Sequence, residues 1–221
     1  MSERTETWKE TAAKRSCTFS NAKKENGVTT ITFMFRLSVG ADYELTYEIT
    51  EQGEVKVMAN YKPEANDILL IPKFGMRMRL PKEFKNVEWY GRGPWENYPD
   101  RKRSQFIGRY QMPLADMMTE YVRPQENGNR SDVRWFEISS QTTKLRVEGL
   151  QPLCIRAWDY GEEDVTVAHP YELRRGRFVN LNIDLNIHGV AGVNTWGHQG
   201  LDEYTIDGNK PYSYSFILKV E

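Results

Sequence analysis

The sequence contains few of the residues that build disulfide frameworks and metal sites. Only two of its 221 residues are cysteines, Cys17 and Cys154, and no CxxC pair or Cys/His cluster occurs. This usage disfavours a disulfide scaffold and a structural zinc site, so two buried free thiols are expected. The three histidines, His169, His188 and His198, lack metal-ligand spacing. No metal site is therefore predicted in this chain.

An excess of charge of one sign and long apolar runs are also missing. Lys plus Arg number 30 and Asp plus Glu number 31, which gives a net charge of −1. This balance lacks the basic footprint of a nucleic-acid-binding protein, so no nucleic-acid partner is predicted. No run of eighteen apolar residues occurs, so no membrane partner is predicted. The charged start, MSERTETWKE, does not have the apolar core of a signal peptide.

Alternation of apolar and polar residues with a period of two dominates what is present. Segments with this pattern are rich in β-branched and aromatic residues, which predicts strands with one buried face. Asn26-Gly27, Gln52-Gly53 and Asp207-Gly208 favour tight turns beside them. The pattern predicts an all-β fold, a single large antiparallel β-sandwich over residues 1–221. The predicted strands are Val28–Val39, Tyr43–Thr50, Glu54–Tyr61, Asp132–Ser140, Lys144–Gly149, Cys154–Tyr160, Phe178–Ile187 and Tyr212–Val220.

Two long loops, Tyr90–Ser104 and Arg123–Asp132, interrupt this pattern. The first reads YGRGPWENYPDRKRS and contains rings but no aliphatic side chain, so it is not expected to be the interior of a strand. Trp95 and Tyr98 are expected to bury their rings beneath this loop. Charged side chains are expected to tie it down by hydrogen bonds. Those side chains are Glu96, Asp100 and Arg101.

Carboxylates are plentiful, but no recognisable catalytic pair is present. A retaining glycosidase needs two carboxyl groups about 5–5.5 Å apart. Glu96, Asp100 and Glu126 lie in loops rich in Asn, Gly and Arg, where carboxylates usually accept backbone N–H groups or pair with Arg. No catalytic residue is therefore assigned in this chain.

The segment His188–Gly197, HGVAGVNTWG, carries a single tryptophan on a glycine-rich loop. A sugar presents an apolar C–H face that can stack on such a ring. Alternatively, the ring of Trp196 folds back onto the core. The residues alone do not separate these two interpretations.

Three stretches carry a resemblance to one family. VEWYGRGPWENYPDRKRS, YVRPQENGNRSDVRW and GVAGVNTWG resemble, in order and spacing, signatures of the C-terminal, small-chain domain of the large β-galactosidases of glycoside hydrolase family 2. The resemblance covers nearly the whole chain. It implies a galactose-mutarotase-like β-sandwich of the supersandwich type. The family domain usually opens with a W-R-x-P-T-D-N-D segment, so the first part of the domain is expected to be missing here.

The resemblance also implies where the chemistry takes place. The catalytic acid/base and nucleophile, both Glu, would lie upstream in a (β/α)₈ barrel, together with the ligands of magnesium and sodium. The chain would support that barrel and be inert alone, and the substrate of the parent would be a β-galactoside. The resemblance leaves open a homo-oligomeric parent, and a location in the cytoplasm or the periplasm of a bacterium.

Trp196 matches the aromatic residue that the family domain lends to the active site. Its implied role is a stacking wall at the mouth of the galactoside pocket. Some members carry acidic residues just before this Trp, where this chain has Val193-Asn194. This difference would alter the shape of the pocket's rim. The secondary candidates for substrate binding are Asn194, Glu126, Asn127 and Arg130.

Two other functions remain open from the sequence. A stand-alone carbohydrate-binding module is compatible with the aromatic loops, and it predicts galactose binding by the chain alone. An aldose-epimerase-like enzyme would need an acid and a base at a sugar C1, for which His169 or His188 with a nearby Glu could be proposed. Only an analogy of fold suggests the epimerase.

Overall fold

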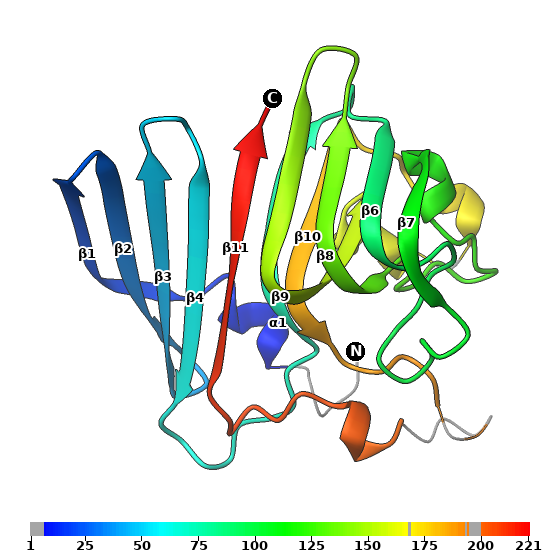
Figure 1. Cartoon of the computed structure of the whole chain (residues 1–221). Coiled ribbons are helices and arrows are strands. Elements are labelled where there is room, and N and C mark those ends of the chain that lie inside the picture. Colours follow the sequence, from blue (N-terminus) through cyan, green and yellow to red (C-terminus); the bar gives the residue numbers. More distant parts are fainter. Residues whose placement is uncertain (1–6, 168, 193, 195–199) are drawn as a thin grey trace.

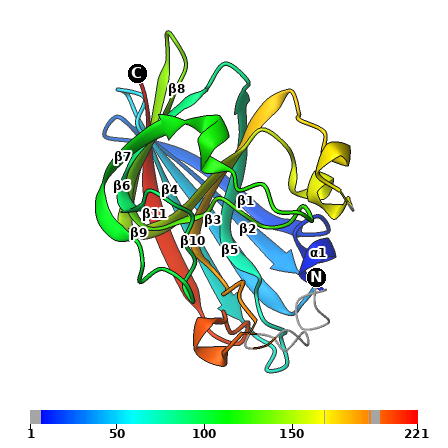
Figure 2. The same ribbon diagram turned by 90° about the vertical axis from the view of Figure 1, so that its right-hand side faces the viewer.

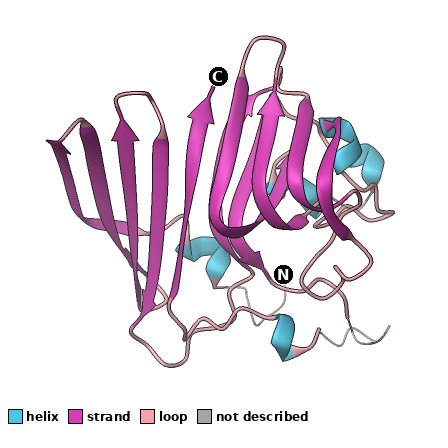
Figure 3. Cartoon of the chain, viewed as in Figure 1, coloured by secondary structure: helices cyan, strands magenta, loops and turns pink. Residues whose placement is uncertain are grey.

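A computed structural model describes residues 7–167, 169–192, 194 and 200–221 of the chain. They form an almost entirely β structure (Figure 1, Figure 3). The strands are β1 (Ser16–Glu25), β2 (Val28–Leu37), β3 (Ala41–Thr50), β4 (Val55–Pro63), β5 (Lys73–Pro81), β6 (Asn86–Gly93), β7 (Phe106–Pro113), β8 (Arg130–Ser139), β9 (Lys144–Trp158), β10 (Phe178–Ile187) and β11 (Tyr212–Val220). The helical segments among the described residues are α1 (Trp8–Thr11) and the 3₁₀ turns η2 (Leu114–Met117), η3 (Glu162–Thr166), η4 (Pro170–Glu172) and η5 (Asp202–Tyr204).

The strands join in the order β1-β2-β3-β4-β11-β9-β8-β6-β7, and each of these pairs is antiparallel. The sheet branches at β9. The first half of this 15-residue strand pairs with β11, and its second half pairs with β10, which in turn pairs with β5. The branch places β5 and β10 behind the main sheet, as the two perpendicular views show (Figure 1, Figure 2).

Aromatic rings fill the space between these two layers. Phe74 of β5 contacts Tyr43 of β3, Tyr61 of β4 and Tyr214 of β11, with ring centroids 6.2, 6.0 and 5.6 Å apart. The apolar residues of β10, such as Leu181 and Ile183, are fully buried in the same core. The β-sandwich expected from the alternating pattern is therefore confirmed.

All eight predicted segments are extended, in seven strands, and the turn Asn26-Gly27 adopts the positive φ angles of 51° and 79° that a tight hairpin requires. Lys144–Gly149 and Cys154–Tyr160, predicted as two strands, belong mainly to the continuous strand β9. The start of the supposed loop, Tyr90–Gly93, is the end of β6, because β7 pairs with all four of these residues and β8 pairs with Tyr90.

One expectation for the cysteines is wrong. Cys154 is buried, but Cys17 is exposed, because it lies on the edge strand β1, all ten residues of which are exposed. None of the helical segments in the described part of the chain combines the length and the hydrophobicity that a bilayer-spanning helix needs.

Candidate functional site

Polar side chains occupy one face of the layer formed by β5, β10 and β9. On β10, Asn180, Asn182 and Asp184 alternate with the apolar core residues, so they point to the opposite face. Their cross-strand partners on β9 are Trp158, Arg156 and Cys154, respectively. This face is buried too, because the loops that contain Glu126 and Glu162 cover it.

Arg156 is the centre of this cluster. Its guanidinium is ion-paired with both Glu126 and Glu162 and donates a hydrogen bond to Asn182 Oδ1 at 3.2 Å. The same group lies 3.6 Å from the centroid of the Trp158 ring. Only 2% of the Arg156 side chain is exposed, so its charge depends on these partners rather than on water.

Lys73 and Asp184 extend the cluster towards β5. Lys73 is ion-paired with Glu162. Burial, helped by the charge of Arg156, lowers the pKa of Lys73, while burial raises the pKa of Asp184 against the opposing effect of Lys73. Gly75 lies opposite Asp184, and a Cβ on Gly75 would stand 1.9 Å from Asp184 Oδ1. Glycine is therefore needed for the two strands to enclose this carboxyl group.

The cluster around Arg156 holds loops in place and is not arranged as a catalytic site. Each of its glutamates, Glu126 and Glu162, is committed to a cation. Arg156 Nε and Asn180 Oδ1 are buried without a hydrogen-bond partner in the part of the chain that the structure describes. The arrangement fixes two covering loops onto the sheet, and it leaves neither carboxylate free to act on a sugar.

The structure distributes the predicted site residues of the Arg123–Asp132 segment over this scaffold. Glu126 is part of the Arg156 cluster. Asn127 is 3% exposed; its Nδ2 donates to the Tyr160 hydroxyl at 2.9 Å, and its backbone oxygen accepts from Trp158 Nε1 at 3.1 Å. Arg130 is 1% exposed and donates to the Gly128 carbonyl at 2.9 Å, and burial lowers its pKa to about 10.

The Tyr90–Ser104 loop is pinned as expected, except at Trp95. Tyr98 is fully buried and Glu96 accepts hydrogen bonds from the Gly128 N–H at 2.7 Å and from Arg101 at 2.6 Å. Trp95, however, is 71% exposed, so the prediction that its ring is buried beneath the loop is wrong. The ring that packs under the loop is that of Tyr98, in a small cluster with Cys154 and Ile187.

The glycine-rich segment that leads towards Trp196 is joined to the same loop. The Ala191 N–H donates to Asp100 Oδ2 at 2.7 Å. Asn194 is exposed. Val193 and Trp196 themselves lie outside the described residues.

The two histidines considered for an epimerase are not members of this cluster, although the His188 N–H donates to the Pro72 carbonyl, next to Lys73. A ring nitrogen of His188 is 2.6 Å from the Gly189 carbonyl, and the His169 ring stacks on Tyr171 with centroids 5.2 Å apart. Within the described residues, neither imidazole contacts a carboxylate. In the same part of the chain, no group of three or more His, Cys, Asp or Glu side chains is arranged to hold a metal.

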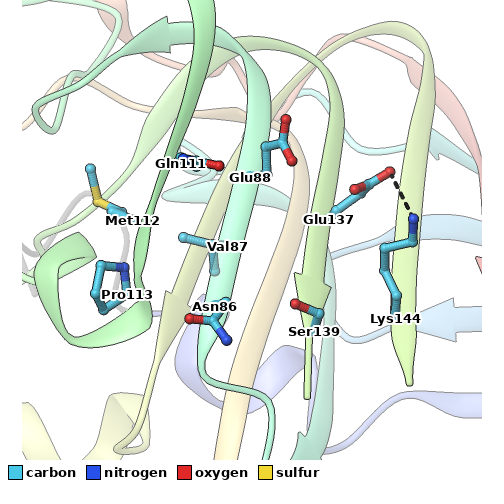
Figure 4. Close-up of a pocket in the computed structure, with 9 residues that line it drawn as sticks. All are labelled: Asn86, Val87, Glu88, Gln111, Met112, Pro113, Glu137, Ser139 and Lys144. Atoms are coloured by element: carbon cyan, nitrogen blue, oxygen red, sulfur yellow. Dashed lines mark ion pairs between the residues drawn. The ribbon is translucent and has the colours of Figure 1, made fainter. Parts of the chain in front are cut away.

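An open hollow of about 610 Å³ lies elsewhere, on the outer face of β6, β7, β8 and β9 (Figure 4). Glu88, Glu137 and Lys144 supply its charged groups, and Lys144 Nζ is 3.8 Å from Glu137 Oε1. The hollow lies at the start of β6 and the end of β8, whereas Arg130 lies at the start of β8. None of the predicted site residues lines it.

Four residues of the cluster were not predicted from the sequence: Lys73, Arg156, Asn182 and Asp184. A signal for them was present in FVNLNIDLNI, where amides and a carboxylate recur at every second position of a strand without turn residues. Such a strand needs hydrogen-bonding partners for its polar face once loops cover it.

Comparisons with known proteins identify the relatives of the chain. A family model described as "Beta galactosidase small chain" matches residues 2–218. The chain is 32% identical to a "Beta-galactosidase" of Priestia megaterium, over 79% of this chain and 17% of the relative, and 30% identical to one of Lactobacillus delbrueckii subsp. bulgaricus, over 89% and 20%. The chain thus spans about a fifth of the length of these curated relatives.

A solved structure shows a similar fold. It is that of a galactose 1-epimerase from Lactobacillus acidophilus NCFM, with a TM-score of 0.52 and 7% sequence identity, and it covers 91% of this chain and 65% of that one. At this identity the likeness shows the fold alone, a sandwich of the galactose-mutarotase type.

Proposed function

Because the chain belongs to the β-galactosidase small-chain family, we propose that it is the C-terminal β-sandwich domain of a β-galactosidase that hydrolyses terminal β-D-galactosides. The family match over residues 2–218 carries this proposal. The parent would act with retention, through a covalent galactosyl-enzyme formed and released by two glutamates. Those glutamates would lie in a barrel that belongs to the remaining four-fifths or so of the parent's length.

The chain alone would be catalytically inert. A retaining glycosidase needs an acid and a nucleophile that face each other across the glycosidic bond. The three carboxylates singled out in the loops of this chain have other tasks: Glu96 and Glu126 pair with arginines, and Asp100 accepts a backbone N–H. Magnesium and sodium, which the resemblance implies, would be held by the barrel.

The direct contribution of the chain to the sugar pocket would be the ring of Trp196. Stacking on the apolar face of galactose would orient the sugar without any part in bond making. Asp100 supports this role, because it fixes Ala191 in the segment that leads to Trp196. Glu126, Asn127 and Arg130 would act indirectly, by holding the neighbouring loop in place.

The proposal is tested by comparing the 221-residue chain with its full-length parent on a chromogenic β-galactoside. The parent is expected to turn the substrate over, and the chain alone is not. Turnover by the pure chain would overturn the assignment of the catalytic groups to the barrel. Calorimetric titration of the chain with galactose tests the alternative, because saturable binding would make it a carbohydrate-binding module.

A further inference from the structure

Two large rings project from one hairpin end of the molecule. Trp95 is 71% exposed and Phe106 is 79% exposed. Phe106 begins β7 directly opposite Gly93 of β6, and the Trp95 N–H donates to Gln105 Oε1 at 3.1 Å. The two rings therefore belong to the same end of the β6–β7 pair, at the opposite edge of the sheet from β1 (Figure 1).

The backbone beneath these rings is held firmly. Asp132 accepts hydrogen bonds from Arg92 Nε at 2.5 Å and from Lys102 Nζ at 2.9 Å, and Arg92 also donates to the Gln105 carbonyl at 2.7 Å. These contacts close the loop at both ends. Rings that are exposed on a fixed backbone lose little conformational freedom when a partner covers them, which favours binding.

We infer that Trp95 and Phe106 form a docking surface for the part of the parent β-galactosidase that holds the catalytic groups. This inference rests on the proposed function. Clustered exposed aromatics mark interaction sites, and tryptophan is enriched among the residues that dominate interfaces. The relatives are about five times as long as this chain, so such a partner surface belongs to the same protein.

The position of the Tyr90–Ser104 loop indicates which partner covers Trp95 and Phe106. Asp100, in the same loop as Trp95, is hydrogen-bonded to Ala191 in the segment that leads to Trp196. If Trp196 reaches the galactoside, this side of the sandwich must face the barrel. The rings of Trp95 and Phe106 then insert into an apolar surface of the barrel and hold the Trp196 segment at the pocket.

Hydroxyl-radical footprinting of the full-length parent and of the 221-residue chain tests this directly. Oxidation of Trp95 and Phe106 is expected to fall several-fold in the parent, while Phe19, 52% exposed on the opposite edge strand, is labelled equally in both. Equal labelling of Trp95 and Phe106 in the two proteins would overturn the inference. Protection in the isolated chain that rises with its concentration would also overturn it, because the occupant would be a second copy.

A double variant distinguishes a failure of the docking inference from a failure of the proposed function. In the parent, Trp95→Ala with Phe106→Ala is expected to lower the apparent melting temperature and to raise KM, whereas Phe19→Ala does neither. In the isolated chain the double variant leaves the melting temperature unchanged. One outcome would refute the docking inference and leave the proposed function intact. In that outcome the parent is an active β-galactosidase and Trp196→Ala impairs it, but the double variant changes neither its KM nor its melting temperature. A parent without activity would remove the proposed function itself.

Discussion

Asp100 and Ala191 are 91 residues apart in the sequence, yet the Asp100 carboxylate accepts the Ala191 N–H at 2.7 Å. The other carboxylate oxygen, Oδ1, is buried without a hydrogen-bond partner among the described residues. The bond ties the Tyr90–Ser104 loop to the segment that leads to Trp196. The two stretches of the family signature therefore work as one structural unit.

Asp100→Ala in the full-length parent is expected to lower kcat/KM by roughly tenfold, since a charge-assisted hydrogen bond contributes about 1.5–3 kcal/mol and part of this would be lost from the positioning of the sugar. Asp100→Asn keeps an acceptor oxygen and is the matched control, with a smaller effect. Steady-state kinetics on a chromogenic β-galactoside measure both. Wild-type kinetics for Asp100→Ala would show that the bond does not position the segment.

Arg156→Met is expected to destabilise the 221-residue chain by about 3 kcal/mol, because it leaves the carboxylate of Glu126 without its cation and that of Glu162 with Lys73 and Arg77 only. Urea unfolding measures this loss. Arg36→Met is the control, since Arg36 also bridges two carboxylates, Asp42 and Glu64, but is exposed to solvent and should change stability little. Equal losses for the two variants would contradict the account of the buried cluster.

Asp184 makes the stability of the chain depend on pH. Burial raises its pKa above the unfolded value of about 3.9, although Lys73 and Arg156 oppose this effect. The folded state therefore binds more protons than the unfolded state above about pH 4, so this contribution to stability is lost as the pH rises through the folded-state pKa. Relative to Asp184→Asn, the wild type should lose stability across that range in urea titrations. A gain with rising pH would mean that Lys73 and Arg156 outweigh burial.

Much of the fold could be predicted from the sequence, since one-face burial imposes the period-two pattern on strands such as β4, β8 and β11. Strands that the alternating pattern did not predict form for other reasons. β1 is exposed along its whole length and so carries no apolar alternation, and β5 mixes Arg with Met because its outer face pairs with Glu162 and Glu163. Tertiary pairing rather than local pattern makes these segments extended.

The site was harder to predict, for reasons that individual residues illustrate. Of the two rings in the Tyr90–Ser104 loop, Tyr98 is buried and Trp95 is exposed, and no local pattern reveals which of them packs against Cys154 and Ile187. The Arg156 cluster brings together residues of β5, β9, β10 and two loops, so their proximity arises only in the folded chain. By contrast, the pinning roles of Glu96, Asp100 and Glu126 followed from their neighbours and are confirmed.

The most direct test of the central claim compares the full-length parent with its Trp196→Ala and Trp196→Phe variants on a chromogenic β-galactoside. The account predicts a large rise in KM, or a large fall in kcat/KM, for Trp196→Ala with the melting temperature unchanged, and partial recovery for Trp196→Phe, which keeps a ring for stacking. Unchanged kinetics for Trp196→Ala would contradict the claim and reduce the domain to a purely structural support.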